Sequence, residues 1–316
     1  EVSWFFRVLL VMLLVDKSAF FTADRYVFRY FRILYISLVC ITWVSFFLKV
    51  GRPMYGNEGI GTRGFYIAGN ELSFLLLVAT VFFLHYFVKL RRYWEFSVVS
   101  VLSVVTAVML ATKVAFIGVI LAVIIVLISA LRNSINLGRL SIRKLEFYFS
   151  IPLLVGFLLI VPLAVEILLE QVGLIERLNY ALSKFDLLTV IMSGRNLQVI
   201  ELIDFYNSAD LRELFFGIGE LKMISLLGQT TEIDFFDFFG FYGLFGLIGF
   251  ITYILYVFQM YKIDATKIAI FILFILISSV AGHVFSSGVA AIPLALLSIY
   301  FYDENSNNYW STSPNN

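Results

Sequence analysis

The polar interval from Glu170 to Asp237 contains three short motifs: Met192–Arg195 (MSGR), Phe216–Gly219 (FGIG) and Thr231–Asp237 (TEIDFFD). The rest of the 316-residue chain is strongly apolar, so that 61% of all residues are hydrophobic, 14% are charged and the mean hydropathy is +0.94. A soluble domain carries about a quarter charged residues. The sequence therefore predicts apolar helices in a lipid bilayer, which hold this interval at one face of the membrane.

Apolar segments of sufficient length recur along the chain. A bilayer core of ~30 Å requires about 20 apolar helical residues. The expected spans lie at residues 1–15, 33–49, 71–88, 96–112, 114–131, 148–168, 238–260, 267–282 and 284–302. The predicted fold is an all-α polytopic integral membrane protein with about nine transmembrane helices. Its expected parts are N-terminal membrane helices (1–168), a large loop with short amphipathic helices (169–237), C-terminal membrane helices (238–302) and a polar cytoplasmic tail (303–316).

Two positions decide how the apolar runs are divided. Lys113 interrupts a run that otherwise extends from 96 to 131, and a lysine at the centre of a bilayer costs about 3 kcal/mol. We therefore expect two helices joined by a tight turn at Lys113. The Gly282-His283 pair is either a turn at the membrane surface or a break within one longer segment.

The distribution of basic residues predicts the orientation. They gather in short loops at 16–32, 89–95, 132–147 and 261–267, which alternate with the remaining loops. Basic loops of this kind face the cytoplasm. The large loop, with eleven Asp and Glu against five Lys and Arg between 169 and 237, is then extracytoplasmic.

Composition also disfavours several classes of function. A net charge of +1 gives no reason to expect a nucleic-acid partner. The single cysteine, Cys40, excludes a disulfide framework and a thiolate metal site, and His85 and His283 are too far apart in sequence to indicate zinc. We expect no metal and no cofactor. The chain starts within an apolar segment and without Met, so we expect residues before Glu1.

The large loop is expected to be folded. Apolar and charged residues alternate at helical spacing from 197 to 205, which indicates an amphipathic helix, and Asp210 with Glu213 forms a helix-capping pattern. Gly217-Ile218-Gly219 predicts a turn with backbone angles that favour glycine. Glycines at 240, 243, 246 and 249 predict close helix contacts.

Three cations are candidate anion ligands. Arg195 follows Ser193-Gly194, and a guanidinium near lipid headgroups suits bidentate binding of a phosphate or pyrophosphate. The alternative is an arginine paired with one of the acids in the loop. Lys113 is either a second cation of an anion pocket or a lysine that extends to the interface. Arg63 has the same two readings, as a ligand or as a solvated charge.

The candidate catalytic carboxylates are Glu232, Asp234 and Asp237, which stand in an aromatic run at the start of a span. Asp234 and Asp237 share a helix face, and Glu232 lies at its edge. A desolvated carboxylate there would act as general base on a sugar hydroxyl; the alternative is a helix N-terminal cap. His283 is expected on the same side of the membrane, as a ligand-binding residue or a helix–helix hydrogen-bond partner.

These motifs resemble the O-antigen polymerase and O-antigen ligase superfamily. Members of that superfamily carry a Ser-Gly-Arg motif, then Gly-x-Gly, then a His-Asn pair before a glycine-rich span. This chain has the first two motifs at Ser193–Arg195 and Gly217–Gly219, with Glu232 in place of the histidine. The region around Arg63 is similar to the motif before an earlier span, and Thr112-Lys113 to a short Ser/Thr-Arg turn. The acidic pattern of Glu232, Asp234 and Asp237 resembles the polymerase branch.

The resemblance implies a GT-C-like membrane glycosyltransferase in the bacterial cytoplasmic membrane, with its active site facing the periplasm. Donor and acceptor would both be glycans linked to undecaprenyl diphosphate, and a flippase and a chain-length regulator would be partners. Arg195, Lys113 and Arg63 would bind the diphosphate, and Glu232 or Asp234 would activate the acceptor hydroxyl. The alternatives are a ligase that transfers the glycan to another acceptor, and a polysaccharide or small-molecule transporter.

Overall fold

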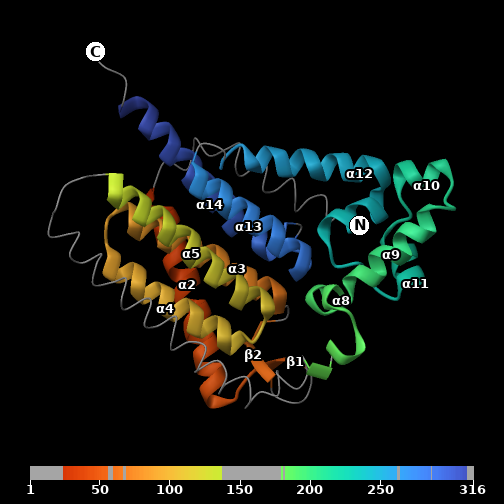
Figure 1. Cartoon of the computed structure of the whole chain (residues 1–316), viewed down its shortest axis with the longest axis horizontal. Helices are drawn as coiled ribbons and strands as arrows, with labels where there is room; N and C mark the ends of the chain where they lie inside the picture. The colour runs from red at the N-terminus through yellow and green to blue at the C-terminus, as the bar shows by residue number, and fades with distance from the viewer. Residues whose placement is uncertain are drawn as a thin grey trace. The chain divides into compact units, whose positions relative to one another are not determined.

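The structure, a computed structural model, describes residues 24–55, 60–66, 69–136, 179–180, 182–261, 264–285 and 287–311. The spans predicted at 1–15 and 148–168 lie outside these residues. The chain divides into two compact units, which are described separately. The first unit comprises residues 25–179, and the second comprises residues 180–316 together with 1–24. In Figure 1 the first unit runs from red to yellow and the second from green to blue.

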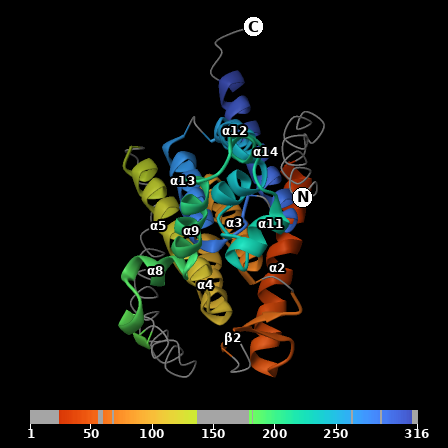
Figure 2. The same ribbon diagram turned by 90° about the vertical axis from the view of Figure 1, so that its right-hand side faces the viewer.

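The first unit is built from four long apolar helices. They are α2 (Asp24–Leu48), α3 (Gly69–Lys89), α4 (Tyr93–Leu110) and α5 (Lys113–Asn136). Helix α3 packs against both α4 and α5 (Figure 2). Aromatic rings such as Phe31 and Phe82, whose centroids are 4.2 Å apart, join α2 to α3. Most of α3 is buried, which explains why apolar residues cover its whole circumference.

The predicted turn at Lys113 is confirmed. Helix α4 ends with Ala111 in the left-handed conformation (φ 55°), and the Ala111 N–H donates to the Val108 carbonyl oxygen at 2.9 Å. The Thr112 hydroxyl oxygen then accepts a hydrogen bond from the Ala115 N–H at 3.1 Å. Thr112 is thus the N-cap of α5. The exposed Lys113 is the first residue of that helix.

Hydroxyl groups join the helices of the first unit. The Tyr35 and Ser103 hydroxyl oxygens are 2.8 Å apart, and Thr80 adds a 2.9 Å contact to the same serine. Ser73 and Thr112 form a similar pair at 2.7 Å. Such neutral hydrogen bonds between helices are typical of membrane interiors.

A two-stranded antiparallel hairpin follows α2 and was not expected from the sequence. Its strands are β1 (Arg52–Tyr55) and β2 (Ile60–Gly64), and β2 contacts α4. A Cβ atom on Gly61 would lie 2.8 Å from the Leu110 carbonyl oxygen, so glycine permits this approach. The hairpin therefore brings the strand that carries Arg63 to the α4–α5 turn, next to which Lys113 begins α5.

The second unit combines short surface helices with long apolar ones. They are α8 (Leu187–Met192), α9 (Arg195–Tyr206), α10 (Leu211–Phe216), α11 (Glu220–Leu227), α12 (Asp234–Phe258), α13 (Ala265–Ala281) and α14 (Gly288–Ser311). The amphipathic helix expected around 197–205 is α9. Asp210 and Glu213 form the expected capping box at the start of α10. Helix α14 continues beyond residue 302 to Ser311, into the region predicted as a tail.

Helix α12 is broken at Gly243, whose φ of 65° and ψ of −153° are open only to glycine. A break at this point deprives the preceding carbonyl groups of their helical donors. The turn between α10 and α11 supplies replacements, because the Ile218 N–H donates to the Gly240 oxygen (2.9 Å) and the Gly219 N–H to the Phe241 oxygen (3.2 Å). The predicted Gly217–Gly219 turn thus caps the first half of α12.

The approach at this break leaves no room for side chains. A Cβ atom on Gly217 would lie 2.5 Å from the Gly243 nitrogen, and a Cβ atom on Gly243 would lie 2.5 Å from the Gly217 nitrogen. In Figure 1, α10 lies next to the α12 ribbon in agreement with their packing. The glycines at 217 and 243 therefore serve one backbone–backbone contact.

The chain is a membrane-embedded, predominantly α-helical protein. Within the described ranges, five helices are long and apolar enough to cross a membrane: α2 (from Tyr26), α3, α4, α5 (to Arg132) and α12. The apolar parts of α13 and α14 are shorter. Between those two helices, residues 282–285 are not helical. The Gly282-His283 pair therefore lies in a break between two helices, which is compatible with both alternatives, a turn at the membrane surface and a break within one longer segment.

Candidate functional site

The Ser-Gly-Arg motif forms a tight corner between α8 and α9. Ser193 (φ 57°) and Gly194 (φ 86°) are both in the left-handed region, and the Gly194 N–H donates to the Thr189 oxygen at 2.9 Å. The corner is held from the other side by Asn196, whose side-chain amide donates to the Thr189 hydroxyl at 2.7 Å. Arg195 is consequently the first residue of α9, at a rigid point of the backbone.

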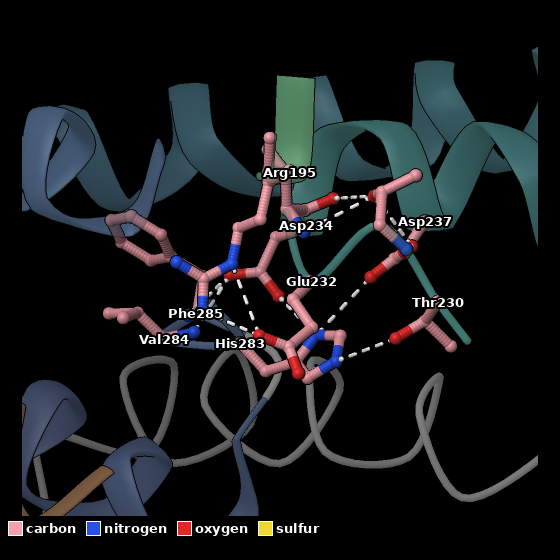
Figure 3. A network of polar contacts seen from close by, with 10 residues as sticks. Arg195, Thr230, Glu232, Asp234, Asp237, His283, Val284 and Phe285 are labelled. Atoms are coloured by element: carbon pink, nitrogen blue, oxygen red, sulfur yellow. Dashed lines mark hydrogen bonds and ion pairs between the residues drawn. The ribbon is translucent and has the colours of Figure 1, made fainter. Parts of the chain in front are cut away.

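The Arg195 side chain is almost completely buried and has two partners. Its Nε donates to Glu232 Oε2 at 3.1 Å, and its Nη2 contacts the same oxygen. Its Nη1 donates to the Val280 carbonyl oxygen in the last turn of α13. A cation at a helix C-terminus is favourable because the helix dipole is negative there. Arg195 therefore joins α9, the segment before α12, and α13 (Figure 3).

Glu232 lies in the segment between α11 and α12, two residues before α12 begins, and its backbone is in the left-handed region (φ 54°). A non-glycine residue in this conformation is uncommon and is often found at functional sites. Its side chain is 40% exposed, against 9% for the Arg195 side chain. Glu232 is thus the outward-facing member of the ion pair.

Asp234 fixes the segment between α13 and α14. Its Oδ2 accepts hydrogen bonds from the Val284 N–H (3.0 Å) and the Phe285 N–H (2.8 Å). These two amides lie beyond the end of α13, so the carboxylate replaces helical acceptors that the segment lacks. The residue is 2% exposed. Asp234 begins α12, but the N-terminus of α12 receives no cap from the side chain of Ile233.

Asp237 is fully buried one turn further along α12. Its Oδ1 accepts hydrogen bonds from the Thr231 N–H (2.9 Å) and the Thr231 hydroxyl (2.8 Å). These bonds tie the segment before α12 to the helix. Asp234 and Asp237 both lie in the first turn of α12, as the helix-dipole alternative expects, but no side chain of the described residues caps the helix, and the partner of Asp237 Oδ1 is Thr231 before it.

His283 lies against both aspartates. Its Nδ1 is 3.6 Å from Asp234 Oδ1 and 3.4 Å from Asp237 Oδ2, and its Nε2 is 3.5 Å from the Thr230 hydroxyl oxygen (Figure 3). Burial by itself lowers the pKa of this imidazole. The hydrogen bond and charge of Asp234, together with the charges of Asp237 and Glu232, outweigh burial and raise the pKa above its ordinary value. The side chain is 26% exposed.

Five residues singled out in the sequence come together in this cluster: Arg195, Glu232, Asp234, Asp237 and His283. The other two predicted anion ligands, Lys113 and Arg63, belong to the first unit. Sequence reasoning missed Thr230 and Thr231, the partners of His283 and Asp237. The available signal was a hydroxyl three or four residues before a helix that starts with an acidic residue. It also missed the Val280 carbonyl, which carries no sequence signal.

The arrangement combines a buried guanidinium, an exposed carboxylate and an imidazole supported by carboxylates at the start of a broken membrane helix. A guanidinium can bind a phosphate or pyrophosphate group, and an imidazole or carboxylate can accept a proton from a hydroxyl.

Comparisons of the chain with protein-family models, with curated proteins and with solved structures found no match. The resemblance to the polymerase and ligase superfamily therefore rests on the short motifs quoted above.

Proposed function

We propose that this protein polymerises undecaprenyl-diphosphate-linked oligosaccharide repeat units into an O-antigen, capsular or exopolysaccharide chain at the outer face of the bacterial cytoplasmic membrane. The observation that supports this function best is the pairing of Arg195 with Glu232 beside His283, in the segments where the apolar helices α12 and α13 begin and end. A site at the end of membrane helices suits a substrate with a lipid tail and a polar head.

In this proposal Arg195 binds the diphosphate of the donor. Nε and Nη2 of the guanidinium both donate to one carboxylate oxygen of Glu232. The same edge of a guanidinium can bind a phosphate. An incoming diphosphate would compete for these donors. Since negative charge grows on the diphosphate as it leaves, removal of one such fixed donor reduces turnover by about 10²–10³-fold in comparable sites.

Lys113 and Arg63 remain proposed diphosphate ligands. They share one end of the first unit, because β2 contacts the end of α4 and Lys113 opens α5. Lys113 is exposed, so its ammonium group is accessible to an anion. A flippase that delivers the lipid-linked units and a regulator of chain length would be the protein partners.

One observation favours the transporter alternative, since interrupted membrane helices are common in transporters, where freed carbonyl groups bind ions. Helix α12 is interrupted at Gly243. Here, however, the carbonyl oxygens of Gly240 and Phe241 already accept hydrogen bonds from Ile218 and Gly219. The break is closed by the protein itself, which supports the enzyme over the transporter.

The test uses cells that lack the gene and are complemented with wild type, Arg195→Ala or Glu232→Gln, followed by gel analysis of their surface polysaccharide. We expect wild type to restore a ladder of chain lengths and both variants to leave one repeat unit. The matched controls are Arg212→Ala and Glu201→Gln, because both side chains are exposed on helices of the same loop. The controls should restore the ladder.

Two other outcomes would overturn the proposal in favour of a named alternative. Loss of all surface glycan, with long lipid-linked polymer accumulating, would establish the ligase reaction. An unchanged ladder in the deletion strain would exclude polymerisation and favour the transporter alternative. Membrane levels of each variant, measured by immunoblotting, separate lost activity from lost protein.

A further inference from the structure

We infer that His283 is the catalytic base that takes the proton from the acceptor hydroxyl, and that Asp234 and Asp237 are the residues that position it. This inference rests on the proposed glycan transfer and names the group that carries out its proton-transfer step. It differs from the expectation from sequence, in which His283 binds substrate and Glu232 or Asp234 is the base.

The backbone around His283 is held in place by a carboxylate. The two residues that follow it donate their N–H groups to Asp234 Oδ2, at 3.0 Å from Val284 and 2.8 Å from Phe285. A non-helical segment between two helices has no other regular hydrogen-bond pattern to fix it. Asp234 therefore determines where the imidazole ring can lie.

The ring is oriented by its two nitrogens. Nδ1 faces Asp234 Oδ1 at 3.6 Å and Asp237 Oδ2 at 3.4 Å, and Asp237 is itself held by two hydrogen bonds from Thr231. Two carboxylates beside Nδ1 favour the tautomer that keeps its proton on Nδ1. Nε2 is then the proton-accepting nitrogen, and it lies 3.5 Å from the Thr230 hydroxyl.

Accessibility separates the histidine from its neighbours. The His283 side chain is 26% exposed, whereas Asp234 and Asp237 are 2% and 0% exposed. The aspartates are thus out of reach of a sugar. Glu232 is partly exposed, but without a bound donor its Oε2 accepts hydrogen bonds from Nε and Nη2 of Arg195, whereas His283 Nδ1 faces two carboxylates.

The charges around the ring make it a stronger base. The carboxylates of Asp234 and Asp237 on α12 and of Glu232 before α12 raise the pKa of His283 despite burial. Arg195 on α9 is the opposing cation, and it is paired with Glu232. A base with a pKa near the working pH combines the deprotonated state with a strong affinity for the transferred proton.

The acceptor hydroxyl oxygen forms a bond to the anomeric carbon of the donor, and the bond from that carbon to the diphosphate oxygen breaks. The electron pair of the broken bond leaves on undecaprenyl diphosphate, whose charge Arg195 stabilises. The hydroxyl proton moves to Nε2 of His283, and the imidazolium later releases it to water.

The test measures polymer formation from purified lipid-linked repeat unit by the protein in proteoliposomes, as a function of pH. His283→Gln should lower turnover by about 10²–10⁴-fold, the usual contribution of a general base, with little change in the KM of the donor. His85→Gln, which alters the only other histidine of the chain, should retain full activity. Thermal unfolding in detergent shows whether each variant is folded.

The pH profile distinguishes a base from a structural histidine. Wild-type turnover should fall as pH decreases through the pKa of His283, and this decrease should be absent from the residual activity of His283→Gln. Asp237→Asn removes one negative charge from the ring environment, so the same decrease should move to lower pH. A folded His283→Gln protein with wild-type turnover and an unchanged profile would overturn the inference alone. A wild-type protein that forms no polymer would overturn the proposed function, and the inference with it.

Discussion

The two units bury polar groups of different kinds. In the first unit the interior hydrogen bonds join neutral hydroxyls, as between Tyr35, Thr80 and Ser103. In the second unit the buried polar groups include ionisable ones beside the hydroxyls: Arg195 is 8% exposed, and Asp237 is fully buried. Both interiors satisfy their polar atoms largely through protein partners, but the energetic consequences of losing a partner are different.

A hydroxyl pair between membrane helices is worth little, about 0.6 kcal/mol on average. A buried charge that loses its partner costs about 3–5 kcal/mol. Ionic groups are therefore a costly way to join helices, and in the second unit they converge near the partly exposed side chains of Glu232 and His283. In the proposed function, the second unit accordingly supplies the charged cluster of the site, and the described interior of the first unit is joined by neutral hydroxyls.

The largest expected effect on stability comes from the backbone contact that shapes α12. Gly243→Ala forces a side chain to within 2.5 Å of the Gly217 nitrogen in a conformation closed to alanine, so we expect a loss of at least about 3 kcal/mol or failure to fold. Gly249→Ala is the matched control, because no atom lies within 4 Å of the added Cβ. Thermal unfolding in detergent measures both. Equal stability of the two variants would contradict the close contact.

The next effect concerns the carboxylate that holds the α13–α14 segment. Asp234→Ala leaves the Val284 and Phe285 amides without their acceptor, which should cost about 1–3 kcal/mol for each unsatisfied group. Asp234→Asn retains an acceptor oxygen and should lose clearly less. Unfolding curves give the stability, and hydrogen exchange at residues 284 and 285 reports the amides directly. Unchanged exchange in Asp234→Ala would show that the carboxylate does not hold this segment.

A smaller effect is expected at the start of α10. Asp210 accepts a hydrogen bond from the Glu213 N–H at 2.7 Å, so Asp210→Ala should cost about 1 kcal/mol. Asp210→Ser, which keeps a capping oxygen, should recover most of the loss. Helix α10 is linked to α12 through the turn that follows it. We therefore expect a smaller relative loss of polymerisation activity than of unfolding free energy. A change in stability below about 0.3 kcal/mol would argue against the capping box.

The smallest effect is expected in the interior of the first unit. Ser103→Ala removes the hydroxyl that Tyr35 and Thr80 contact, and the expected cost is about 0.6 kcal/mol, with activity unchanged. The result is measured by thermal unfolding and by the polymerisation assay. A loss comparable to that of Asp234→Ala would remove the distinction between the two interiors.

The sequence predicted those features that depend on local patterns. Hydropathy located α3, α4 and α5, and the cost of a lysine within a bilayer placed the turn at Lys113. Capping chemistry placed the start of α10 at Asp210, and the positive-φ turn at Gly217–Gly219 followed from glycine alone. Such features are local because the residues that determine them lie within one or two helical turns of one another.

The contacts of the site were decided by tertiary structure. Arg195 and Glu232 are 37 residues apart, and Asp234 reaches amides 50 and 51 residues away. The β-hairpin and the break in α12 also depend on packing against distant backbone, at Leu110 and at Gly217. Sequence alone determined which ionisable residues border the membrane helices, because charges are excluded from lipid. Only the fold decided which of them became partners, because a buried charge is stable only beside the group that the chain brings to it.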